Sequence, residues 1–149
     1  MISARITRSI CARPSVRRLI VDTGPLVALA NEAERRHQAA VAFFDGFDGA
    51  LLTTVAVVTE ACSLLPRHRI APFLRGIGRS NFALVHVPAQ DLPLLAALME
   101  KYSDRPMDFA DASLLWLADA LGLGDIATLD SGFHIYRTRR GRALRNRFV

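Results

Sequence analysis

The stretch LIVDTGPLVALA at residues 19–30 decides the fold, because it joins a buried strand directly to a helix. The apolar run that ends at Val21 has the length and composition of a parallel strand buried on both faces. Gly24 and Pro25 interrupt this run, and proline is favoured at the first position of a helix, here one that continues to Ala30. Asp22 follows the strand with no polar loop between them. The stretch therefore predicts a strand–helix unit with a carboxylate at its turn.

The rest of the chain alternates short apolar runs with longer helical patterns. This alternation indicates an α/β fold with a central, mostly parallel sheet of four to five strands flanked by helices. The segment IATLD at residues 126–130 ends on Asp130, as the first strand ends on Asp22. Ligands of open parallel sheets bind outside the carboxyl ends of the strands, so both aspartates are expected at one edge. The predicted strands are residues 17–22, 50–54, 82–87 and 125–130, with a fifth at residues 133–137. The predicted helices are residues 25–30, 34–47, 55–65, 70–80, 91–102 and 109–121.

The charge distribution divides the 149-residue chain into an acidic body and two basic arms. Residues 1–18 contain five arginines and residues 131–149 contain six, with no acid in either arm. The body between them has 8 basic and 14 acidic residues, a balance of −6. Such a length fits one domain. The asymmetry suggests that carboxylates in the body hold cations while the arms meet an anionic polymer.

Cysteine content and hydropathy limit the cellular setting. The two cysteines, Cys11 and Cys62, have no metal-ligand spacing, which argues against a zinc site and fits a reducing cytosol. The least polar window, residues 49–66, is too short to span a bilayer. We therefore expect a cytoplasmic protein without a membrane partner.

Two further regions place acids in apolar surroundings. Glu60 is the sole charge in residues 49–66, and on these residues alone a solvated position is favoured over one that faces a cation, because glutamates are usually exposed. Asp108 and Asp111 stand three residues apart at the start of an apolar helix, where capping is the simpler interpretation. Asp111 differs from Asp108 because apolar residues follow it at once, so its carboxylate is expected to project toward the sheet edge.

Carboxylates gathered at one edge require positive charge between them, because they would otherwise repel one another and raise their own pKa values. The arginines of the body cluster at residues 67–79 and do not follow the acidic segments, so a metal is the better explanation. Oxygen ligands without histidine or cysteine favour Mg²⁺ or Mn²⁺, as one or two ions, over zinc. Such a site suits hydrolysis of a phosphodiester by a metal-activated water.

The segments LIVDTGPLVAL, VVTEACSLL, DFADASLL and IATLDSGF, in this order, resemble the four acidic motifs of PIN-domain nucleases, particularly the VapC-type toxins of bacterial toxin–antitoxin pairs. The resemblance covers residues 18–136 and implies a PIN-like three-layer sandwich. It also implies a metal-dependent endoribonuclease with an RNA substrate, a cognate antitoxin and a homodimeric assembly. Residue by residue, it implies metal ligation and catalysis by Asp22, Glu60, Asp111 and Asp130, supporting hydroxyls on Thr23 and Thr128, and a further acidic ligand at Asp108.

The two ends of the chain, residues 1–17 and 137–149, lie outside the resemblance. We expect residues 1–17 to be a disordered basic extension and residues 137–149 to be a basic tail. In the tail, Arg137, Arg139 and Arg140 are candidates for RNA binding, and a solvated terminus is the equally weighted alternative. Two other functions stay open at this point: a housekeeping PIN nuclease that processes RNA without an antitoxin, and a non-catalytic module that binds RNA or protein. The intact acidic positions argue against the second.

Overall fold

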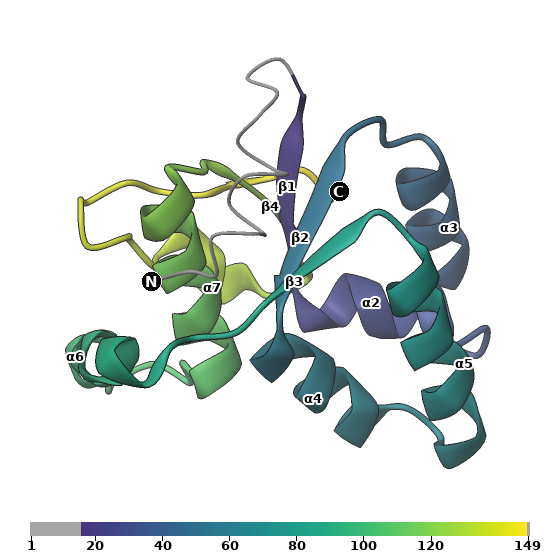
Figure 1. The fold of residues 1–149 in the computed structure, drawn as a ribbon, viewed down its shortest axis with the longest axis horizontal. Coiled ribbons are helices and arrows are strands. Elements are labelled where there is room, and N and C mark those ends of the chain that lie inside the picture. The colour runs from purple at the N-terminus through teal and green to yellow at the C-terminus, as the bar shows by residue number, and fades with distance from the viewer. Residues whose placement is uncertain (1–15, 149) are drawn as a thin grey trace.

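The computed structural model describes residues 16–148, and the predicted basic extension lies, except for its last two residues, outside the described residues. Five parallel strands form one sheet in the order β3-β2-β1-β4-β5 (Figure 1). The predicted α/β fold around a mostly parallel sheet is confirmed. The strands are β1 (Arg18–Val21), β2 (Ala50–Thr54), β3 (Phe82–Val85), β4 (Asp125–Ala127) and β5 (Arg145–Asn146).

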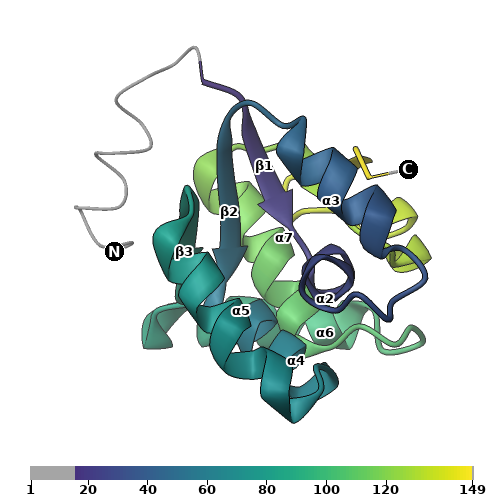
Figure 2. The ribbon, with the colours of Figure 1, turned by 90° about the vertical axis from the view of Figure 1, so that its right-hand side faces the viewer.

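The helices cover the two faces of the sheet and its carboxyl edge (Figures 1 and 2). Helices α2, α3 and α5 lie on one side and α6 and α7 on the other, while α4 contacts both α2 and α7 at the edge where β1 and β2 end. The bounds are α2 (Thr23–Ala30), α3 (His37–Asp45), α4 (Val55–Leu64), α5 (Arg67–Arg79), α6 (Leu92–Lys101) and α7 (Phe109–Leu121). None of the helices in residues 16–148 is long and apolar enough to cross a membrane.

Burial on both faces explains the apolar run that opens the sequence. Leu19, Ile20 and Val21 are at most 1% exposed, because β1 is the central strand and has helices on either side. Helix α7 is buried around most of its circumference, as its continuous apolar sequence requires. Trp116 on this helix is buried in the core, and its indole N–H donates to Asp91.

The predicted strand at residues 133–137 is wrong. A 3₁₀ turn, η2 (Ser131–His134), follows β4 instead, because the Asp130 carboxylate accepts a hydrogen bond from the Gly132 amide and bends the chain. The fifth strand, β5, comes from the basic tail. Its Asn146 side chain accepts from the Thr128 amide and donates to the Thr128 carbonyl, which continues the ladder beyond β4.

Candidate active site

The first acid of the site stands where β1 ends and α2 begins. Asp22 caps α2: one carboxylate oxygen accepts from the Thr23 amide at 2.7 Å and the other from the Thr128 hydroxyl at 2.6 Å. Thr128 is close because β1 pairs in parallel with β4, Val21 opposite Ala127. Asp22 is only 4% exposed, so it has little contact with bulk water and these two hydrogen bonds take its place.

Thr128 links the first acid to the last. Its hydroxyl donates to Asp22 and accepts from the Asp130 amide at 2.9 Å. The Asp130 carboxylate is in turn oriented by the Gly132 amide at 2.8 Å. The expectation that Asp22 and Asp130 share the carboxyl edge of the sheet is therefore matched by a hydrogen-bonded chain between their segments.

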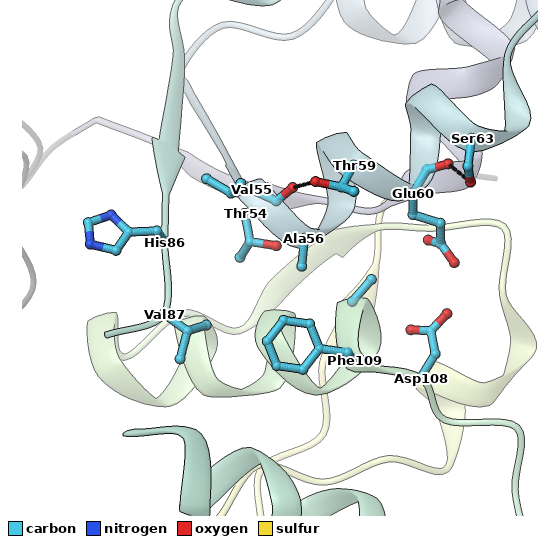
Figure 3. Close-up of a pocket in the computed structure, with 11 residues that line it drawn as sticks. Thr54, Val55, Ala56, Thr59, Glu60, Ser63, His86, Val87, Asp108 and Phe109 are labelled. Atoms are coloured by element: carbon cyan, nitrogen blue, oxygen red, sulfur yellow. Dashed lines mark hydrogen bonds between the residues drawn. The ribbon is translucent and has the colours of Figure 1, made fainter. Parts of the chain in front are cut away.

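Glu60 and the pair Asp108 and Asp111 approach from two helices. The Thr23 hydroxyl donates to the Glu60 carboxylate, which is half-buried. Asp108 and Asp111 form a reciprocal capping box, with amide-to-carboxylate distances of 2.9 and 3.1 Å, so the capping interpretation is confirmed for both. Asp111 is nevertheless 7% exposed, and Asp108 faces Glu60 across a groove (Figure 3).

The carboxylates of this cluster are electrostatically coupled. Burial raises the pKa of Asp22 to about 6, against the hydrogen bonds from Thr128 and Thr23, and the charges of Asp130 and Asp108 raise it further. Burial and the neighbouring Asp108 carboxyl group raise the pKa of Glu60 to about 7. Burial, with the charges of Asp108, Asp22 and Asp130, raises the pKa of Asp111 to about 8. Neighbouring carboxylates of the cluster therefore contribute to all three raised pKa values.

No lysine or arginine among residues 16–148 forms an ion pair with these acids. Within the same residues, no three ligand-type side chains stand close enough to enclose an ion as they are placed. Each carboxylate is instead turned toward a hydroxyl or amide of its own surroundings. An all-oxygen, uncompensated donor set of this kind fits a hard divalent cation.

Beside the acids, a groove of about 530 Å³ runs between α4 and the start of α7. Glu60 and Asp108 stand at one end, and His86 stands at the other (Figure 3). Its wall between them is mainly apolar, with Val55, Val87 and Phe109. His86 is exposed, and the groove connects it with the acids.

Tyr136 is a residue of this region that sequence reasoning missed. It is fully buried, and its hydroxyl has no hydrogen-bond partner among the described residues. Burial and the charges of Asp111, Asp130 and Asp108 raise the pKa of Tyr136 to about 12. A Cβ atom on Gly132 would lie 3.0 Å from this phenol, so a larger residue there would require the tyrosine ring to shift. No signal in the sequence identified the tyrosine, because it lay in the wrongly predicted strand.

The arginines of the tail are not gathered with the acids. Arg137 donates from its guanidinium to the carbonyls of His134, Ile135 and Tyr136, which occupies that end of the side chain. The Arg139 amide binds Asp119, about 12 Å along the axis of α7 from Asp111. Arg139 and Arg140 line a separate groove with Trp116, so any RNA contact they make would lie away from the acids.

Comparisons with known proteins identify the family. Residues 19–138 match the PIN domain. Ribonuclease VapC26 of Mycobacterium tuberculosis (strain ATCC 25618 / H37Rv) is 30% identical over 117 residues, covering 75% of this chain and 86% of that relative. The crystal structure of Mycobacterium tuberculosis VapC20, described as a sarcin-ricin loop cleaving toxin, has a similar fold with a TM-score of 0.70. It is 20% identical and covers 76% of this chain and 90% of its own.

The chain therefore belongs to the PIN-domain family. Within that family, the relatives found here are VapC proteins, one of them named a ribonuclease and the other a toxin.

Proposed function

We propose that this protein is a metal-dependent endoribonuclease and the toxin of a toxin–antitoxin pair. The observation that supports this most directly is the position of four acids from distant segments at one edge of the sheet. Three of these, Asp22, Glu60 and Asp111, have pKa values raised by burial and by neighbouring acids, and none of the four has a cationic partner among the described residues. Such a cluster is unfavourable unless a cation binds it.

The ion would be held by Asp22, Glu60, Asp111 and Asp130, with Asp108 as a further ligand, and Mg²⁺ or Mn²⁺ fits their oxygens. One or two such ions would supply an activated water and neutralise charge on the phosphate. The threonines would position the ligands: Thr128 orients Asp22, and Thr23 orients Glu60. Because every acid accepts from a hydroxyl or a backbone amide, each carboxylate would have a defined orientation before RNA arrives.

The partners of the protein are proposed from its relatives. One is named a ribonuclease and the other a sarcin-ricin loop cleaving toxin, which favours RNA as substrate here. A cognate antitoxin, a homodimeric assembly and a cytoplasmic location follow from the toxin hypothesis. The tail arginines Arg137, Arg139 and Arg140 would contact only RNA that extends beyond the acidic edge.

The experiment is incubation of the purified protein with labelled RNA in the presence of Mg²⁺, Mn²⁺ or a chelator. Cleavage should require a metal and should disappear in Asp22→Asn, which keeps the size of the side chain. Asp48→Asn is a matched control, because Asp48 is exposed in the turn before β2, at the opposite edge of the sheet. Cleavage that persists in the chelator, or full activity of Asp22→Asn, would overturn the metal mechanism.

A further inference from the structure

The groove between α4 and the start of α7 is acidic at one end and mainly apolar along the rest of its length. Its acidic end belongs to the proposed metal site, through Glu60 and Asp108. From there, the wall continues over Phe109 and Val55, which face the open groove (Figure 3). Among the described residues, no lysine or arginine lines it. The acidic end therefore suits a cation and the phosphate that the cation binds, whereas the rest suits an uncharged, flat and apolar group.

The exposure of the Phe109 side chain is not explained by the packing or the capping of α7. As the first residue of α7 it has a backbone fixed by the Asp108 cap, and 44% of its surface is exposed. Val55, at the first position of α4, is also 44% exposed. Isolated exposed apolar residues need no explanation. Here, however, two such residues line one groove beside the half-buried Glu60 and the exposed Asp108, and apolar residues grouped in this way are typical of binding surfaces.

We propose that this groove binds a nucleobase of the RNA strand next to the cleaved phosphate, with the ring of Phe109 as its stacking surface. The inference rests on the proposed function and adds a subsite to it. In a nucleotide, the base is the uncharged, planar part that lies beside the phosphate, and RNA-binding proteins commonly stack unpaired bases on aromatic side chains.

The dimensions and the far end of the groove agree with this occupant. Its volume of about 530 Å³ lies within the range of small-molecule sites, about 300–1,000 Å³. His86, an exposed residue with a flat ring, lines the end remote from the acids (Figure 3). Because no basic residue of the described chain lines the wall, a second phosphate is disfavoured there, and the base, rather than the backbone, suits the groove.

The test measures binding of short single-stranded RNA that carries one fluorescent 2-aminopurine, moved through every position in turn. Asp22→Asn serves as a non-cleaving background in Mg²⁺ buffer. Stacking quenches 2-aminopurine, so one position should be quenched with Phe109 present and not in Phe109→Leu, which keeps apolar bulk but has no aromatic face. Phe109→Trp should retain the quenching. The affinity of Phe109→Leu should be about tenfold lower, within the range measured for base–aromatic stacking.

Two controls make the result specific. Leu64→Ala removes an exposed apolar residue of α4 that does not line the groove, and it should leave affinity and quenching unchanged. An RNA with an abasic site at the quenched position should bind equally well with and without the Phe109→Leu substitution. Equal affinity and equal quenching for Phe109→Leu on intact RNA would overturn the subsite.

The subsite and the proposed function fail in different ways. If the wild-type protein cleaves RNA with metal but Phe109→Leu leaves quenching and affinity unchanged, the subsite is wrong and the nuclease stands. If no RNA is cleaved under any metal condition while quenching depends on Phe109, the nuclease proposal is wrong and base binding by the groove is supported.

Discussion

The two ends of β4 place the same type of side chain in opposite electrostatic settings. Asp125, at the start of the strand, pairs with Arg145 at 2.9 Å and with Arg147 at 3.3 Å. Asp130, just beyond the other end, has no ion pair among the described residues and shares its surroundings with Asp22 and Asp111. The carboxylate of Asp125, which has only a structural role, is thus neutralised by arginines. At the carboxyl edge, the carboxylates of the described residues are left without counter-charge, which is the arrangement expected of a site for a cation.

Among the substitutions at the two ends of β4, Asp111→Asn near the carboxyl end should have the largest effect on cleavage. The amide can still accept from the Asp108 amide, so the cap persists, but a charged oxygen ligand is lost. We expect metal-dependent cleavage to fall by at least about a thousandfold, since a metal contributes several kcal/mol of charge stabilisation in the transition state. The measurement is the initial rate of cleavage at saturating Mg²⁺.

The same variant should be more stable than the wild type without metal, because it no longer has to bury that charge. A higher thermal midpoint in chelator, together with lost cleavage, would distinguish a ligand from a structural residue. A lower midpoint would mean that Asp111 acts mainly through the cap, and the comparison of the two ends would fail on this residue.

Thr128→Val should have a smaller effect on the same edge. The hydroxyl donates to Asp22 and accepts from the Asp130 amide, so valine removes both contacts while keeping the shape of the side chain. Groups that orient metal ligands typically change affinity or activity about 10- to 100-fold. We therefore expect a loss of that size, measured as the Mg²⁺ concentration at half-maximal rate. Thr138→Val is the control, because the Thr138 hydroxyl accepts from the Arg142 amide in the tail and does not contact the acids.

Sequence reasoning predicted the positions of the acids at the sheet edge better than it predicted the structure of the C-terminal region. Asp22 and Asp130 could be predicted because each follows an apolar strand, and the edge rule for parallel sheets is independent of detail. Glu60 needed the family resemblance, since an isolated glutamate in a helix is usually solvated. The strand β5 could not be predicted, because it depends on hydrogen bonds between the Asn146 side chain and the Thr128 backbone, which are 18 residues apart. The burial of Tyr136 could not be predicted either, because it depends on the turn in which the Asp130 carboxylate accepts from the Gly132 amide.

The stability of the protein should depend on pH because the carboxylates at the carboxyl edge of the sheet have no counter-charge among the described residues. The pKa values of Asp22, Glu60 and Asp111 are raised to about 6, 7 and 8, above their values in the unfolded chain. The folded protein therefore binds more protons than the unfolded one, and its stability falls as the pH rises from about 5 to about 8. In chelator the thermal midpoint should drop over this range, and Mg²⁺ should restore it near pH 8 but change little near pH 5. An equal effect of Mg²⁺ at both pH values would contradict the proposed site.

Asp125→Asn tests the compensated end and should have the smallest effect. The carboxylate is 27% exposed and its two arginine partners are more exposed still, so water and salt screen the pairs. Such pairs contribute about 0–1 kcal/mol each, which corresponds to a decrease of about 2–4 °C in thermal midpoint for each kcal/mol lost in a chain of this size. Cleavage and its Mg²⁺ dependence should stay unchanged, and the decrease should shrink at high salt. A loss of cleavage in Asp125→Asn would mean that β5 and its arginines support the acidic edge through β4, and that the two ends of the strand are coupled.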